Sequence, residues 1–239
     1  MIDLPVMSQG QEASWRGLIQ VSSILPTGWC LVGGQMVHLH CWERGVWPSR
    51  PTDDVDAVLD VRARPQILLS FTTALRDLGF TSAGESWEGH QHRWVRDDAQ
   101  IDVLIPRHVG QRASSRQGIT GGTTLETPGA QAALERAEPV QVRLHELTGT
   151  ILRPTLQGAI AAKSAAYTVV NDRHRDRHLT DLIVLSTLIT PSDHVADGLT
   201  RTERARILAA IRGIESRPGL IDTISGGREG IARLKLALS

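Results

Sequence analysis

Two aspartates and a pair of adjacent glycines are the residues of this sequence whose types and spacing point most directly to chemistry. Asp54 and Asp56 open an expected strand, and side chains two residues apart on a strand project from the same face. Gly33 and Gly34 precede an expected helix, and backbone N–H groups at a helix N-terminus form a site for an anion. Two carboxylates on a buried strand are costly unless cations neutralise them. A phosphate-binding turn that faces a carboxylate pair predicts a metal–nucleotide site.

The elements that must position these residues follow from the surrounding pattern. The apolar run 29–32 predicts a strand that ends at the glycines, because glycine has no Cβ to obstruct a turn. Residues 35–44 predict a helix that ends at Gly45, and the strand with the two aspartates follows. An amphipathic helix is expected before this stretch, at 9–24, and another after it, from Pro65 to Gly79.

A later strand contributes a third carboxylate. Residues 80–105 predict a hairpin whose last strand alternates in character. Ile101, Val103 and Ile105 face one way, whereas Asp102 faces the other. An aspartate inside an otherwise apolar strand calls for an explanation.

The rest of the sequence predicts a mainly helical part. Residues 106–127 are rich in Gly, Ser, Thr and Arg and predict a long flexible loop at the boundary between two lobes. A short helix and a hairpin are expected next, followed by helices at 155–170, 178–190, 201–215 and 228–238. The expected fold class is α+β: a small mixed sheet with helices, followed by a helical C-terminal lobe. The expected domains are 1–120 and 121–239.

Lys163 lies on the apolar stripe of the expected helix 155–170. Lysine rarely occupies a buried face without an anionic partner, which favours a functional role. The alternative is a lysine at the edge of the stripe whose ammonium group reaches solvent.

Composition and charge restrict the class of protein. The 239 residues carry a formal net charge of zero, so no global basic field draws the chain to nucleic acid or membrane, although local basic patches still can. Cys30 and Cys41 stand in apolar surroundings and are expected to be reduced core thiols. No apolar run approaches the ~20 residues of a membrane span, and no signal peptide is evident. We therefore expect a soluble cytoplasmic protein.

Taken together, these residues resemble the DNA polymerase β-like nucleotidyltransferase superfamily. Its pattern of a glycine turn opening a helix, an Asp-x-Asp strand and a third Asp is matched by Gly33-Gly34, Asp54-Val55-Asp56 and Asp102. The nearer resemblance is to the AbiEii-type branch, toxins of type IV toxin–antitoxin pairs, whose Arg-x-Thr-x-Asp-x-Asp motif is matched by residues 50–56. That branch also has a Lys, an Arg and an acidic residue in a helical region, matched by Lys163, Arg173 and Asp181.

The resemblance, which covers about residues 29–190, implies an activity and its partners. It implies a nucleotidyltransferase that moves NMP from an NTP to a hydroxyl of tRNA or protein, with a cognate antitoxin protein as partner. Asp54, Asp56 and Asp102 would bind Mg²⁺, and Lys163 would neutralise phosphate charge. The implied nucleotide-binding residues are Gly33, Gly34, Gln35, Arg50, Thr52, Arg173 and Asp181.

Two positions depart from the family pattern. Gln35 stands where a Thr or Ser usually follows the glycines, so a hydroxyl contact to phosphate is missing. Arg177-His178 replaces a Lys-Asp pair that often precedes the last acidic residue. A module that binds nucleotide but has lost catalysis is therefore one alternative function, and an antibiotic nucleotidyltransferase acting on an aminoglycoside or lincosamide is another.

Several of these residues also have ordinary structural interpretations. Asp54 can cap a turn together with Asp53, and Arg50 can pair with Asp53 on the surface. His90 and His92 alternate on an expected strand, where a polar rim is favoured over a zinc site. The charged run 171–178 favours a solvated segment over contact with acceptor phosphates.

Overall fold

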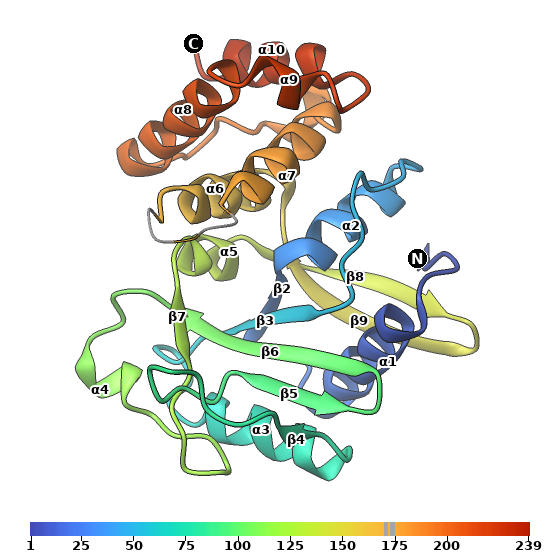
Figure 1. Ribbon diagram of the computed structural model, residues 1–239, viewed down its shortest axis with the longest axis vertical. Coiled ribbons are helices and arrows are strands. Elements are labelled where there is room, and N and C mark those ends of the chain that lie inside the picture. The colour runs from blue at the N-terminus through green and yellow to red at the C-terminus, as the bar shows by residue number, and fades with distance from the viewer. Residues whose placement is uncertain (170–171, 173–174) are drawn as a thin grey trace.

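The computed structural model describes residues 1–169, 172 and 175–239, which form a six-stranded mixed sheet, a three-stranded sheet and a group of C-terminal helices (Figure 1). This arrangement confirms the α+β fold class expected from the sequence. Within the described residues, every helix is too short or too polar to cross a bilayer.

The six-stranded sheet is the centre of the fold. Its order is β2-β3-β6-β5-β4, and β7 pairs with β6 outside that path. β3 and β6 run parallel, whereas β2 pairs antiparallel with β3 and β5 antiparallel with β6. The strands are β2 (Trp29–Val32), β3 (Val55–Leu59), β4 (Thr81–Ser82), β5 (Arg93–Arg96), β6 (Ala99–Pro106) and β7 (Leu125–Thr127).

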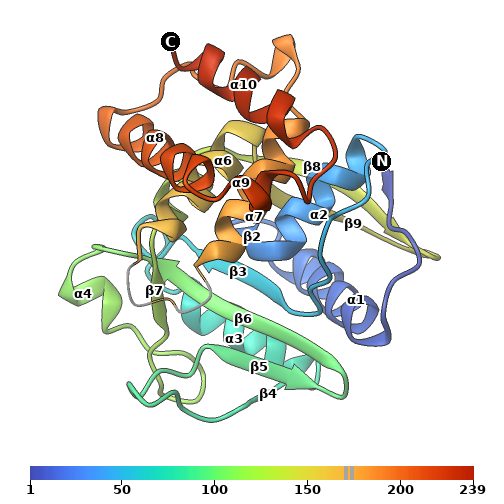
Figure 2. The ribbon, with the colours of Figure 1, turned by 45° about the horizontal axis from the view of Figure 1, so that its top comes forward.

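Two amphipathic helices, α1 (Gln9–Ile24) and α3 (Ile67–Asp77), cover one face of this sheet (Figure 2). Ser8 caps α1 by accepting a hydrogen bond from the N–H of Gln11, and the helix buries Trp15 and Leu18 completely. The α1 boundaries agree with the range expected from the hydrophobic period.

The other face of β3 and β6 lies below a group of helices (Figures 1 and 2). α2 (Gly33–Glu43) and α5 (Ala130–Glu135) contact β3, and α6 (Leu156–Tyr167) packs beside α7 (Asp176–Thr187). The helices α8 (Arg201–Glu215), α9 (Pro218–Ile221) and α10 (Gly227–Ala237) pack against α6 or α7, and η1 (Pro191–Asp193) lies between α7 and α8 in the chain.

A second sheet joins the N-terminus to the middle of the chain. Its order is β1-β8-β9, formed by β1 (Ile2–Asp3), β8 (Ala137–Leu144) and β9 (Leu147–Pro154). β9 packs against α1 and β2, so this sheet extends the same apolar core. Cys30 and Cys41 are both buried free thiols in that region.

The expectation of a long flexible loop at 106–127 is wrong. This segment contains α4 (Gln111–Ser114) and strand β7, and its Thr124 is buried with its hydroxyl donating to the carbonyl of Val103. The reason is long-range pairing: β5 pairs with the first half of β6, and β7 pairs with the last three residues of β6. Composition alone does not reveal a pairing of that kind.

Candidate active site

The three aspartates of the sequence motifs lie together at the centre of the main sheet. Asp56 on β3 is paired in register with Asp102 on β6, and Asp54 lies one residue before β3 rather than inside it. One carboxylate oxygen from each aspartate lies within 4.8 Å of an oxygen of each of the other two. Among the described residues, this is the one group of His, Cys, Asp or Glu side chains close enough to hold a metal ion.

The loop before β3 positions Asp54. Thr52 donates its hydroxyl to Asp54 at 2.6 Å, and the Thr52 carbonyl accepts from the Gln35 amide at 2.6 Å. The Gln35 oxygen in turn accepts hydrogen bonds from Trp15 and Gln11. Gln35, which the sequence placed among the nucleotide-binding residues, is therefore completely buried in the core and holds the loop from behind.

The glycine turn packs directly against the acidic cluster. Gly33 has φ +70, and a Cβ built on it would lie 1.7 Å from Oδ2 of Asp56. A Cβ on Gly34 would lie 2.7 Å from the Thr52 side chain. Both glycines are thus required by close approach, because they let the first turn of α2 touch the residues that carry the carboxylates.

Replacing Gly33 by Ala should displace the Asp56 carboxylate. We expect at least a hundredfold loss of any reaction that depends on the cluster, since misplacement by about 1 Å costs roughly that much. Gly45→Ala is the matched control: Gly45 also has φ +65, but no atom lies within 4 Å of its added Cβ. Both variants carry the same backbone strain of about 1–2 kcal/mol. Equal losses of activity in the two would contradict a steric role for Gly33.

A cleft of about 390 Å³ opens between the sheet and helices α6 and α7. Its lining includes most of the residues expected from the motifs: Gly33, Gly34, Arg50, Thr52, Asp54, Asp56, Asp102 and Lys163. One wall is apolar and is formed by side chains such as Val32, Leu104, Leu125, Ala130, Ala162 and Ala166. The volume and the mixture of apolar wall and convergent polar groups are typical of a small-molecule site.

The electrostatics of the cluster favour a bound cation. Burial, together with the neighbouring carboxylates of Asp54 and Asp102, raises the pKa of Asp56 from 3.8 to about 7. A cation bound beside Asp56 would favour the ionised form of this carboxylate. Closely spaced carboxylate oxygens are the donors that Mg²⁺ prefers, so the residues present fit a divalent ion.

Lys163 does not face the cluster as a free cation. Its Nζ lies 2.6 Å from Asp181, whose two oxygens also accept hydrogen bonds from Arg50 at 2.9 Å. Lys163 and Asp181 are both buried. Burial alone would raise the pKa of Asp181, but Lys163 and Arg50 together lower it to about 2. The three charges join the loop before Asp54 to helices α6 and α7.

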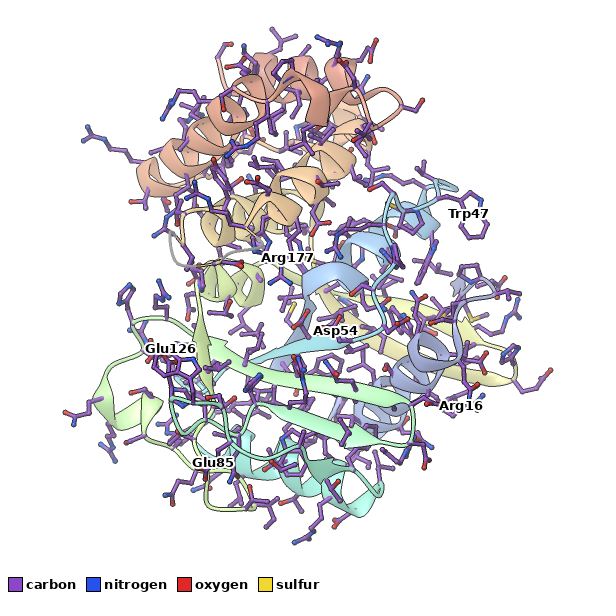
Figure 3. The ribbon with its side chains drawn as sticks, in the orientation of Figure 1. Arg16, Trp47, Asp54, Glu85, Glu126 and Arg177 are labelled. Atoms are coloured by element: carbon purple, nitrogen blue, oxygen red, sulfur yellow. The ribbon has the colours of Figure 1, made fainter. Side chains whose placement is uncertain are left out.

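Several residues of the cleft were not among the expected site residues, and two of them are adjacent. Arg177 and His178 stand at the start of α7, and Figure 3 shows Arg177 and Asp54 on opposite sides of the cleft. Burial and the charges of Lys163 and Arg177 lower the pKa of His178 to about 4, so this imidazole is neutral near pH 7. Arg177 is exposed, as expected for the charged run, whereas His178 is partly buried in the cleft. Arg173 lies outside the described residues.

Arg93 also lines the cleft, where it pairs with Asp102. Its position could have been found from the hairpin, because the two-residue turn Asp97-Asp98 between β5 and β6 sets Arg93 opposite Asp102. His92 lines the cleft as well, whereas His90 bonds to Thr123 and is not among the lining residues.

No protein-family model and no curated protein sequence matches this chain. Solved structures do match it. An antigenic nucleotidyltransferase-like protein from Paracoccidioides brasiliensis aligns with a TM-score of 0.54 and 16% identity over 91% of this chain and 93% of its own. The antibiotic-resistance factor ANT(2'')-Ia aligns with a TM-score of 0.47 and 13% identity over 89% of this chain and 99% of its own. The first of these matches shows that this chain shares the fold of a nucleotidyltransferase-like protein.

Proposed function

We propose that this protein is a Mg²⁺-dependent nucleotidyltransferase that moves NMP from an NTP to an acceptor hydroxyl. The observation that supports this most strongly is the contact between Gly33 and Asp56 inside the cleft. It sets a helix N-terminus suited to phosphate beside a cluster of three carboxylates suited to a divalent ion. The shared fold supports the same reaction class.

The residues have distinct roles in this proposal. Asp54, Asp56 and Asp102 would hold Mg²⁺, which when bound neutralises charge on the substrate phosphates. The first turn of α2 would bind the triphosphate through backbone N–H groups, and Arg177 would face it from α7. Lys163, which lines the cleft and pairs with Asp181, would add its charge there. Most of the catalysis would come from positioning and charge stabilisation.

The transfer itself balances without a further reactant. The acceptor oxygen forms a bond to the α-phosphorus of the NTP, and the bond between that phosphorus and the bridging oxygen breaks to release pyrophosphate. The proton of the acceptor hydroxyl passes to a carboxylate of the cluster, with Asp102 as the candidate.

The charge beside the cleft favours an RNA acceptor. Residues 103–125, from the middle of β6 to the start of β7, include Arg107, Arg112 and Arg116, and the first acidic residue after them is Glu126, which lines the cleft. Arg107 lines the cleft itself. A basic rim attracts a phosphate backbone and repels a cationic drug. We therefore propose tRNA as the first acceptor to test, and, by the resemblance to AbiEii-type toxins, a cognate antitoxin protein as the partner that restrains the enzyme.

The direct test is transfer from each α-³²P-labelled NTP, with Mg²⁺, to total bacterial tRNA and to whole-cell protein. We expect label in the tRNA fraction with the wild type and at least a thousandfold less with Asp54→Ala or Asp102→Ala. Asp53→Asn, which removes an exposed charge beside the motif, should transfer at the wild-type rate.

Each alternative outcome has a definite meaning. Label in protein alone would replace the RNA acceptor by a protein hydroxyl, and modification of an aminoglycoside or lincosamide would replace it by a drug. Nucleotide binding without transfer to any of these would overturn the proposed activity in favour of a silent nucleotide-binding module. Growth arrest on expression of the wild type, but not of Asp54→Ala, would support the toxin role.

A further inference from the structure

The protein places a cation of its own against the acidic cluster. Arg93 on β5 lies directly opposite Asp102 on β6. Its Nε donates to Oδ1 of Asp102 at 3.0 Å and its Nη2 donates to Oδ2 at 2.9 Å. This two-pronged geometry fixes the plane of a carboxylate as well as its place. The Asp102 side chain is 9% exposed and that of Arg93 is 43% exposed, so the guanidinium holds the carboxylate from the solvent side.

The register of three strands determines which side of Asp102 remains open. Asp56, Asp102 and Arg93 form one row across β3, β6 and β5, with Asp102 in the middle. An ionised carboxylate has about four lone-pair directions, and the Arg93 fork uses one on each oxygen. The remaining lone pairs are free to face Asp54 and Asp56, whose carboxylate oxygens lie within 4.8 Å of an oxygen of Asp102.

Arg93 is itself held in place. Gln100 precedes Asp102 by two residues on the same face of β6. With its amide oxygen turned toward Arg93, Gln100 accepts hydrogen bonds from Nε and Nη2 at 3.1 Å. The guanidinium is thus bound by two neighbouring side chains of one strand, which restricts its movement away from Asp102.

We propose that Arg93 is the positioning residue of the metal site: it aligns the Asp102 carboxylate so that its free lone pairs point at the ion shared with Asp54 and Asp56. This inference rests on the metal site of the proposed function. The change in metal affinity on removing Arg93 has one sign if Arg93 aligns Asp102 and the opposite sign if Arg93 is a placeholder, a cation that occupies the place of the metal. A placeholder competes with the metal, so its removal would tighten metal binding, whereas loss of a group that aligns a ligand weakens binding about 10–100-fold.

The test is Mn²⁺ binding to the full chain without nucleotide, followed by the electron paramagnetic resonance signal of free Mn²⁺. We expect Arg93→Gln to raise the Kd at least tenfold. Arg93→Lys keeps the charge but cannot form the fork, so it should also weaken binding, by a smaller factor. Arg76→Gln removes the same charge from α3, outside the cleft, and should leave the Kd unchanged within twofold, since Arg76 is exposed and pairs with the neighbouring Asp77.

The outcomes separate the inference from the proposed function. Equal or tighter Mn²⁺ binding by both Arg93 variants would overturn the positioning role. Absence of Mn²⁺ binding by the wild type would overturn the metal site and the inference together. A third outcome is that the wild type binds Mn²⁺, that Arg93→Gln weakens this binding, and that no acceptor receives NMP. This outcome would support the inference and contradict the proposed function. Melting curves in EDTA check that each variant is folded. If Arg93→Gln is not folded, the Kd of Arg93→Lys decides between the outcomes.

Discussion

Asp56→Asn is expected to abolish nucleotidyl transfer and, at the same time, to raise the melting temperature of the metal-free protein. The carboxylate lies in register with Asp102 and close to Asp54 without a hydrogen-bonded cation of its own in the described residues. Its pKa of about 7 in the folded chain lies above the ordinary value of 3.8. Ionising Asp56 therefore costs stability, by about 2 kcal/mol once partial solvent access is allowed for. For a chain of this size that is about 4–8 °C.

The sign of the pH dependence follows from the direction of this shift. The penalty is absent below about pH 4 and grows as the pH rises through about 7, because the unfolded chain ionises first. The difference in melting temperature between Asp56→Asn and the wild type should thus be larger at pH 8 than at pH 5. Mg²⁺ should raise the melting temperature of the wild type but not of the variant.

Calorimetric scans in EDTA and in Mg²⁺, each at the lower and the higher of these pH values, measure the melting temperatures of the wild type and Asp56→Asn. Asp53→Asn serves as the matched control, because it removes an exposed carboxylate three residues away and should show the wild-type pH dependence. A variant that melts below the wild type at pH 8, or that still transfers NMP, would contradict this account of the cluster.

The second large effect concerns the buried ion network. Asp181→Asn should lower the free energy of unfolding by about 3–5 kcal/mol, because it leaves the buried Lys163 ammonium without its counter-ion. The guanidinium of Arg50 loses the same partner, although it is partly exposed and can reach water. Urea unfolding followed by circular dichroism measures the loss.

A surface pair provides the comparison. Asp222 accepts two hydrogen bonds from Arg228 at 2.7 Å in a similar two-pronged geometry, but both side chains are more than half exposed. Asp222→Asn should therefore cost less than about 1 kcal/mol. If Asp181→Asn lowers the free energy of unfolding by no more than Asp222→Asn does, the buried network stabilises the fold no more than a surface ion pair.

A double variant separates stability from activity in the same network. Lys163→Met combined with Asp181→Leu replaces the buried pair by apolar side chains and should recover most of the lost stability. Transfer should remain low, because the cleft has lost the charge of Lys163, which lines it. Full recovery of transfer would mean that Lys163 acts only through the fold.

The sequence predicted the parts of the site that depend on local pattern. The helix α1, the strand β2 and the glycine turn all follow from short-range periodicity and from residues that interrupt it. Gln35 could not be assigned in this way, because its role depends on Trp15 and Thr52, which lie 20 residues before and 17 residues after it. The partner of Lys163 likewise emerges only from the packing of α6 on α7.

The closeness of Gly33 to Asp56 has a thermodynamic consequence. The turn that would bind phosphate in the proposed function lies against a carboxylate that would bind the metal, so a shift of one moves the other. Occupancy of one therefore changes the free energy of filling its neighbour, and such coupling is reciprocal. Whatever factor a divalent ion adds to the affinity for triphosphate, triphosphate must add to the affinity for the ion. The ion and the triphosphate would then bind cooperatively, each at a lower concentration when the other is present.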